Sequence, residues 1–192
     1  MYSEIVPGRL WAGSINSVKP ENMRALTDKG LVCVVSCLPI GQVGAFPPEV
    51  IEPKPKAHHI LTCWDDEVVE PKRIDYAIHL NVPTLIHCNA GQNRSTCIAA
   101  CWLLKHDGWL THPSTTWQEA LVAVTLKRRE LLGREPKVYD EMRENVRRYA
   151  EWLRARTASP TGRLRHSEPA MQNVPIKSEL GSRIKKAFRG SE

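Results

Sequence analysis

The chain has 192 residues, of which 42% are hydrophobic and 25% charged, a composition typical of one globular domain of ordinary size. Its net charge of +6 and pI of about 9.1 favour acidic partners such as phosphate groups or nucleic acid. The longest apolar run, Cys97 to Leu104, is too short to span a bilayer, and the N-terminus lacks the features of a signal peptide, so we expect a cytoplasmic protein without membrane insertion.

Strand and helix patterns alternate along the first part of the chain. A short strand is predicted over residues 5–13, ending at a glycine turn. Pro20 to Lys29 has the pattern of a helix that stops at Gly30. Leu31 to Leu38 is apolar throughout, which predicts a strand buried on both faces. Five prolines then predict a loop over residues 39–57.

The later elements complete an α/β pattern. They are a strand at Ile60–Trp64, a short helix from Pro71 to near Asn81, a buried strand at Pro83–His87, a buried helix at Ser95–His106, and two amphipathic helices at about Thr115–Leu132 and Pro136–Arg156. This order predicts an α/β domain over residues 1–156, with a central, mostly parallel sheet flanked by helices. The polar segment 157–192 is predicted to be a basic, disordered tail.

The loop between the last predicted strand and the buried helix is a candidate phosphate-binding loop. It reads His87-Cys88-Asn89-Ala90-Gly91-Gln92-Asn93-Arg94-Ser95 and lies at the carboxyl end of a strand, where ligands bind in such sheets. Its backbone N–H groups and the N-terminus of the following helix can surround a tetrahedral anion. The residues expected to bind substrate are Asn89, Ala90, Gly91, Gln92, Asn93 and Arg94.

Two side chains of this loop suggest nucleophilic catalysis. Arg94 lies at the helix start, where its planar guanidinium can bind two phosphate oxygens. A thiol beside a helix N-terminus and a cation favours the thiolate form, which makes Cys88 the candidate nucleophile. The hydroxyl of Ser95 can hydrogen-bond the sulfur and ease its departure.

The spacing of Cys88, five residues and Arg94 resembles the Cys-x5-Arg signature of the protein tyrosine phosphatase superfamily. The segment Val6–Ser14 is similar to the opening strand of its dual-specificity members, and the likeness covers roughly residues 3–155. The resemblance implies a phosphatase that hydrolyses phosphomonoesters of protein Tyr, Ser and Thr through a phosphocysteine. It implies no cofactor and no metal, and a phosphorylated protein as the partner.

The resemblance also implies a general acid on an upstream loop. The segment Cys63-Trp64-Asp65-Asp66-Glu67 is similar to the Trp-Pro-Asp loop of the family, although the proline is absent. We expect Asp65 to be the acid because it is nearest to Trp64, and Asp66 remains the competing choice.

Two other functions remain open at this point. Gly91-Gln92-Asn93-Arg94 fits the Gly-x-Asn-Arg pattern of related RNA 5′-triphosphatases, and the basic balance suits RNA, although no aromatic-rich basic groove is evident. A pseudophosphatase that binds phosphoproteins without turnover is the alternative from another class. The neutral side chains at the variable loop positions argue against a highly charged lipid headgroup.

The other cysteines, the histidine pair and the charge run are expected to be structural and not functional. Without an export signal, the six cysteines are expected to be thiols, and all but Cys88 small buried hydrophobes. Some relatives protect the oxidised nucleophile by a disulfide, for which Cys37 and Cys63 are candidates, but packing in the core is the preferred interpretation. His58-His59 is expected in a surface loop and not at a metal. The charge run Lys127–Arg129 is expected to face solvent.

Overall fold

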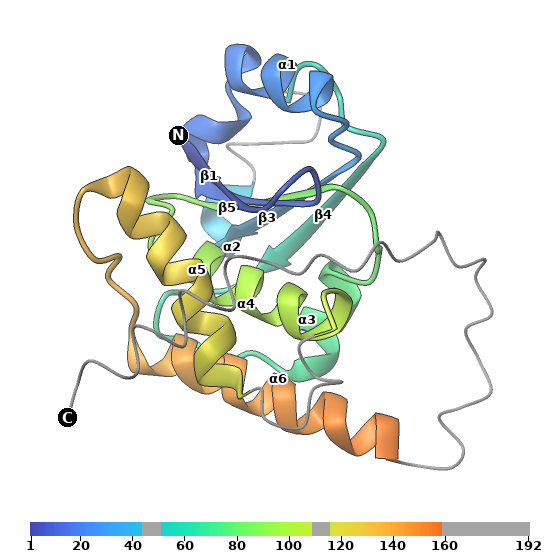
Figure 1. Cartoon of the computed structure of the whole chain (residues 1–192), viewed down its shortest axis with the longest axis vertical. Helices are drawn as coiled ribbons and strands as arrows, with labels where there is room; N and C mark the ends of the chain where they lie inside the picture. Colours follow the sequence, from blue (N-terminus) through green and yellow to red (C-terminus); the bar gives the residue numbers. More distant parts are fainter. Residues whose placement is uncertain (44–50, 109–115, 159–192) are drawn as a thin grey trace.

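The computed structural model describes residues 1–43, 51–108 and 116–158. A five-stranded sheet lies at its centre in the order β1-β2-β5-β3-β4 (Figure 1). The strands are β1 (Tyr2–Val6), β2 (Leu10–Ser14), β3 (Cys33–Leu38), β4 (Ala57–Thr62) and β5 (Thr84–Cys88). β1 pairs antiparallel with β2, and the other three pairings are parallel. The predicted α/β fold with a mostly parallel central sheet is confirmed.

The first predicted strand is wrong in one respect. Residues 5–13 do not form a single strand, because the chain reverses at Gly8 and makes the β1–β2 hairpin. Gly8 has a φ of +65°, which favours glycine, and its N–H donates to the Glu4 carboxylate at 2.9 Å. The reversal places β1 at the edge of the sheet and β2 beside the central strand β5.

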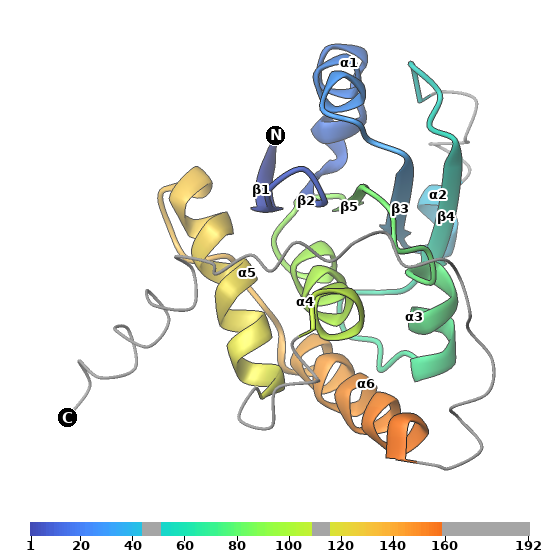
Figure 2. The same cartoon turned by 45° about the vertical axis from the view of Figure 1, so that its right-hand side comes forward.

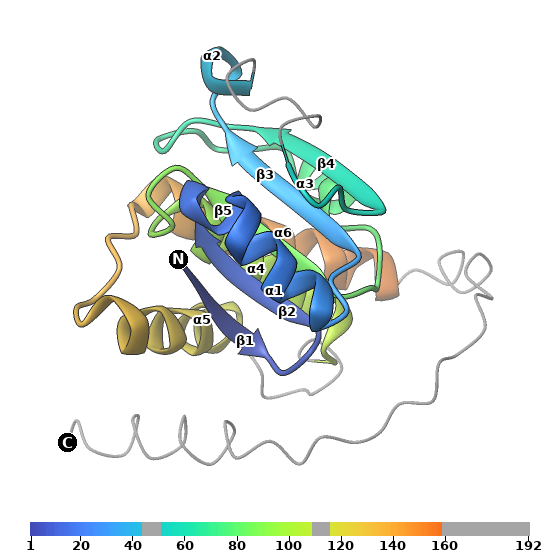
Figure 3. The same cartoon turned by 90° about the horizontal axis from the view of Figure 1, so that it is seen from above.

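The helices cover the two faces of the sheet unequally, as Figures 2 and 3 show. Helix α1 (Pro20–Asp28) and the short helix η1 (Ile15–Val18) lie on one face, over a small apolar cluster that contains Trp11, Met23 and Leu85. In the described part of the chain, the helices on the other face are α3 (Pro71–Ala77), α4 (Arg94–His106), α5 (Trp117–Leu132) and α6 (Asp140–Ala158).

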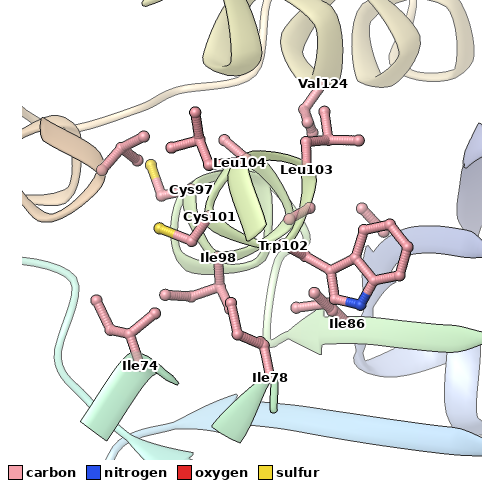
Figure 4. Packing of buried hydrophobic residues seen from close by; sticks show 14 of the residues in the cluster. Ile74, Ile78, Ile86, Cys97, Ile98, Cys101, Trp102, Leu103, Leu104 and Val124 are labelled. Carbon is pink, nitrogen blue, oxygen red and sulfur yellow. The ribbon is translucent and has the colours of Figure 1, made fainter. Parts of the chain in front are cut away.

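Helix α4 is the centre of the larger core. Every residue from Arg94 to Leu104 is buried, as predicted from its apolar sequence. Figure 4 shows side chains from the surrounding elements packed against it, among them Ile74 of α3, Ile86 of β5 and Val124 of α5. The helix that follows the candidate loop is therefore held from several sides, which fixes the position of its N-terminus.

Helix α5 has the predicted extent, but one of its charged residues is buried and not exposed as predicted. Its start is defined by a capping box between Thr116 and Glu119, and it ends at Gly133, which adopts a φ of +68°. The predicted solvated charge run is wrong for Arg128, which is 1% exposed, whereas Arg129 is exposed. Arg128 continues the buried face of the helix one turn beyond Val124, so its position and not its charge decides its burial.

Smaller differences concern element ends. The predicted loop over residues 39–57 contains the single-turn helix α2 (Ile40–Val43) and reaches the start of β4, while residues 44–50 lie outside the described part. Helix α3 ends at Ala77 and not near Asn81. Helix α6 starts at Asp140 and not at Pro136. The predicted disordered tail falls almost wholly on residues 159–192, which are outside the described residues.

Candidate active site

The segment 88–94, which we call the Cys88 loop, curls around the thiol of Cys88. Strand β5 ends at Cys88 and helix α4 begins at Arg94. The Gly91 N–H donates to Cys88 Sγ at 3.2 Å, and the thiol donates to Ser95 Oγ at 3.3 Å. Cys88 is only 1% exposed. The sulfur thus lies inside the loop, beside the Gly91 N–H and the helix N-terminus.

Gly91 is required by both the conformation and the crowding of the loop. Its φ is +70°, and a Cβ at this position would lie 2.6 Å from Ser14 N and 2.7 Å from the Gly13 carbonyl carbon. The start of η1, directly after β2, also supports the loop, because Ile15 N–H donates to Asn89 O at 3.0 Å. A side chain at Gly91 would therefore push the loop away from β2.

Arg94 joins the Cys88 loop to residues 63–69, which carry the two candidate acids and which we call the acid segment. Its side chain is buried, and its Nε donates to Asp65 Oδ1 at 3.0 Å. A second bond runs from Arg94 Nη1 to the carbonyl of Cys63 at 3.4 Å. The Asp65 side chain is 46% exposed, so it faces both the guanidinium and solvent. Asp66 is exposed, and within the described residues no hydrogen bond joins it to the loop.

Asn93 links three segments through its side-chain amide. Its Nδ2 donates to Asp65 Oδ1 at 2.9 Å and to the Asp65 carbonyl at 3.1 Å. Its Oδ1 accepts from Tyr139 N–H at 3.0 Å, and the neighbouring Gln92 accepts from Lys137 N–H at 3.3 Å. The two side chains thus hold the acid segment and the α5–α6 connection against the Cys88 loop.

The far end of the acid segment is attached to helix α6. The Asn145 side chain donates to Glu67 O at 2.8 Å and accepts from Val69 N–H at 2.6 Å. Sequence reasoning did not identify Asn145 as a functional residue. The available signal is its place as a polar residue in the buried stripe of α6, next to Val146.

A buried polar chain crosses the sheet beside Cys88. Ser36 Oγ lies 2.6 Å from His87 Nε2 and 2.8 Å from His58 Nε2. Burial lowers the pKa of His87 to about 3, so its imidazole is neutral at pH 7. Burial also lowers the pKa of His58. His58 lies on β4 and not in the predicted surface loop, because strand pairing with β3 brings it over Ser36.

The other five cysteines are packed thiols. All six cysteines are free and buried. Burial raises the pKa of Cys33 to about 11 and that of Cys63 to about 12, and it also raises the pKa of Cys37, Cys97 and Cys101. These thiols are therefore protonated at neutral pH, in agreement with their interpretation as packed core residues.

Two further findings limit the kinds of site in the described ranges. Among residues 1–43, 51–108 and 116–158, no group of three or more His, Cys, Asp or Glu side chains is placed to hold a metal ion. In the same ranges no helix combines the length and apolar character needed to cross a membrane.

Solved structures with the same fold are phosphatases and phosphatase-like proteins. PTPMT1 in complex with PI(5)P aligns with a TM-score of 0.61 and 15% identity, over 82% of this chain and 99% of that one. Human DUSP28 aligns with a TM-score of 0.56 and 17% identity, over 80% and 95% of the two chains. The human tyrosine phosphatase-like serine/threonine/tyrosine-interacting protein aligns with a TM-score of 0.57 and 19% identity, over 79% and 97%. The resemblance to the protein tyrosine phosphatase superfamily is confirmed for the fold.

Comparison by sequence finds proteins other than phosphatases. No protein-family model matches the chain. The thermostable DNA polymerase I of Thermus filiformis is 53% identical over 36 residues, 19% of this chain. A thermostable DNA polymerase I of Thermus thermophilus is 32% identical over 112 residues, 57% of this chain. The chain spans only 4% and 12% of the length of these two polymerases.

Proposed function

We propose that this chain, which has the fold of the dual-specificity and tyrosine phosphatases, is a cysteine-dependent phosphatase that hydrolyses phosphomonoesters of protein Tyr, Ser and Thr. The observation that supports it most is the position of Cys88 Sγ inside a loop whose Gly91 N–H points at it, directly before the helix that starts at Arg94. The loop can hold a phosphoryl group against the thiolate, with Arg94 binding its oxygens.

The first chemical step transfers the phosphoryl group to the enzyme. The Cys88 thiolate attacks phosphorus, an S–P bond forms, and the ester P–O bond breaks. Asp65 donates a proton to the departing oxygen, which would otherwise leave as a poor anion. Its contact with Arg94 places the carboxyl group beside the loop, and its exposed face is open to a substrate.

The second step releases phosphate. A water attacks phosphorus, the S–P bond breaks, and the Asp65 carboxylate takes the proton of the water. The Ser95 hydroxyl, 3.3 Å from the sulfur, keeps its proton and donates a hydrogen bond to the thiolate as it departs. Inorganic phosphate leaves and the enzyme is restored, so the cycle needs no co-reactant other than water.

The substrate class is inferred from the loop and its surroundings. The side chains at the variable positions Asn89, Ala90, Gln92 and Asn93 are neutral, and those of Gln92 and Asn93 accept backbone N–H groups of the α5–α6 connection. This supports a phosphorylated protein over a polyanionic lipid headgroup. RNA 5′-triphosphate remains the second candidate, on the pattern from Gly91 to Arg94, and a non-catalytic phosphoprotein-binding role is the third.

A substrate panel with a nucleophile variant tests the proposal. The unmodified chain, Cys88→Ser and the control Cys33→Ser, which changes a buried thiol outside the loop, are assayed for phosphate release. The substrates are phosphotyrosine peptide, phosphothreonine peptide, PI(5)P and 5′-triphosphorylated RNA. We expect hydrolysis of the peptides, retained in Cys33→Ser and lost in Cys88→Ser, because a serine hydroxyl stays protonated near neutral pH.

The binding of a phosphate analogue separates the outcomes. Cys88→Ser should still bind tungstate, because Arg94 and the loop N–H groups remain. Substantial turnover by Cys88→Ser would rule out the phosphocysteine. Exclusive hydrolysis of the RNA would select the triphosphatase, and peptide binding without turnover by the unmodified chain would select the non-catalytic role.

A further inference from the structure

Arg128 of helix α5 lies directly behind the Cys88 loop. Its Nε donates to Gly91 O at 3.0 Å, and its Nη1 donates to Ala12 O at 2.8 Å and to Ser3 Oγ at 3.1 Å. The side chain is 1% exposed. The guanidinium thus connects α5, the β1–β2 hairpin and the loop in one buried contact.

The charge of Arg128 has no carboxylate partner among the described residues. None of the ion pairs between these residues includes it, and all three of its acceptors are neutral. Burial lowers the pKa of the guanidinium, and the charge of Cys88 acts in the opposite direction. The Met1 amino group lies near Arg128 and offers it no counter-charge. Burial lowers the pKa of this amino group most, and the charge of Arg128 lowers it further. A buried cation without a counter-charge is strongly unfavourable, so an anion is expected nearby.

The bond to Gly91 O also sets the direction of a peptide group. The Gly91 carbonyl and the Gln92 N–H belong to the same planar trans peptide and point in opposite directions. With the carbonyl held by Arg128 on the outer side, the Gln92 N–H is directed toward the inner side of the loop. Gly91 N–H itself points at Cys88 Sγ, so Arg128 holds the peptide group next to a donor that faces the sulfur.

The other groups that face Cys88 leave Arg128 a distinct role. Arg94 at the start of α4 is the other cation, but its charge is shared with the Asp65 carboxylate. His87 is neutral, because burial lowers its pKa to about 3. The thiols that face Cys88 from β3, α4 and the end of β4 are neutral, because burial raises their pKa; they are Cys37, Cys97 and Cys63. Among the described residues near the sulfur, Arg94 is therefore paired with a carboxylate, whereas the positive charge of Arg128 is not.

We propose that Arg128 is a positioning residue for the phosphatase reaction, which acts through Gly91 and supplies a second buried positive charge to the thiolate and to the bound oxyanion. The inference rests on the proposed function for its role in turnover. Its effects on thiol ionisation and on anion binding can be measured without turnover.

Three variants separate charge, geometry and simple loss of packing. Arg128→Met removes the charge and all donors, and Arg128→Lys keeps the charge but loses the planar fork. Arg129→Met is the matched control, because Arg129 is the adjacent, exposed residue of the same helix and pairs with Glu135 at 2.7 Å. Folding of each variant is checked by thermal unfolding before any other measurement.

The readouts are the pH dependence of Cys88 alkylation and the affinity for tungstate. Alkylation by iodoacetamide is followed by mass spectrometry on the peptide that carries Cys88. In Arg128→Met we expect the midpoint pH of alkylation to rise by about one unit, a tenfold change in the ionisation equilibrium, and tungstate binding to weaken about tenfold or more. Arg128→Lys should keep the midpoint near that of the unmodified chain but bind tungstate more weakly, because the Gly91 carbonyl loses its positioned donor.

Each outcome decides between a functional and a purely structural residue. If folded Arg128→Met matches Arg129→Met in both readouts, Arg128 is only a structural clamp and the proposal is overturned. If Arg128→Met does not fold, Arg128→Lys decides: an unchanged midpoint with weaker tungstate binding supports the proposal, and a midpoint raised by about one unit overturns the role of the charge. If these effects occur but the unmodified chain hydrolyses no phosphoester, the proposed function fails and the role of Arg128 stands.

Discussion

At the scale of single residues, Asp65 and Asp66 have different surroundings despite their adjacent places in the sequence. Asp65 accepts hydrogen bonds from Arg94 and Asn93, so its carboxyl group is fixed beside the Cys88 loop. Asp66 is exposed and has no such bond within the described residues. The two residues lie at a turn after β4, and the bonds from Arg94 and Asn93 select the Asp65 side chain as the one that faces the loop.

The leaving group provides a test of this difference. Asp65→Asn should slow hydrolysis of a phosphotyrosine peptide by roughly 10²–10⁴-fold, the usual contribution of a positioned acid. It should slow an activated aryl phosphate much less, because that leaving group is already a stable anion. Steady-state kinetics on both substrates measure the effect, and the alkaline limb of the pH–rate profile should disappear in the same variant.

Asp66→Asn is the matched control, and it should change neither the substrate dependence nor the pH profile. If Asp66→Asn shows the effects expected for Asp65→Asn and the reverse, Asp66 is the general acid and the phosphocysteine mechanism still holds. If neither variant depends on the leaving group, the acid lies elsewhere, or the substrate needs none, as expected for a triphosphate.

At the scale of elements, the Cys88 loop depends on its contact with the end of β2. Gly91→Ala should destabilise the protein by about 1–3 kcal/mol and weaken tungstate binding, because the φ of +70° is unfavourable for alanine and the new Cβ would lie 2.6 Å from Ser14 N. Chemical denaturation and tungstate titration measure the two effects.

Gly8→Ala provides the control for Gly91→Ala. Gly8 has nearly the same φ, +65°, but a Cβ added there would meet nothing within 4 Å, so only the conformational cost applies. We expect Gly8→Ala to lose some stability and to bind tungstate normally. Equal losses of binding in both variants would show that the contact with β2 does not shape the loop.

Much of the element pattern could be predicted, because buried strands and helices leave clear apolar runs. The helix after the loop is predicted from its apolar residues, and Arg94 to Leu104 are all buried. The hairpin at Gly8 is not predicted although Pro7-Gly8 is a turn dipeptide, because the apolar residues on both sides of it favour one continuous strand over residues 5–13.

The candidate loop itself could be located from sequence, but its supports could not. The sequence places Cys88 and Arg94 next to a strand and a helix, whereas Arg128 and Asn145 reach the site from helices far along the chain. Arginine in a charge run and asparagine in a helix usually face solvent. Only the packing of α5 against the sheet and of α6 against the other helices brings Arg128 to the loop and Asn145 to the segment that carries Asp65.

At the scale of the whole molecule, one buried and one partly buried histidine connect folding to pH. Burial lowers the pKa of His87 to about 3 and that of His106 to about 4, whereas an unfolded histidine has a value near 6.5. The unfolded state therefore binds more protons than the folded state below pH 6.5. Stability from these residues is present above that pH and is lost as pH falls toward their folded values.

We expect the free energy of unfolding to decrease between pH 6.5 and pH 5 by up to about 1.4 kcal/mol per pH unit for each histidine. Urea denaturation at pH 7, 6 and 5 measures the slope. His106→Gln should remove the contribution of one histidine and reduce the slope accordingly. A slope that is flat in the unmodified chain would mean that these side chains are protonated in the folded state.

The segment that carries Asp65 is attached at both ends, to Asn93 on one side and to Asn145 of α6 on the other. Many enzymes bring such a segment into place by a closing motion on the microsecond to millisecond scale, and that motion can limit turnover. Here hydrogen bonds from Arg94, Asn93 and Asn145 hold this segment beside the Cys88 loop. We therefore expect turnover to be insensitive to solvent viscosity, with no gating step between the binding of a phosphoester and the breaking of its bond.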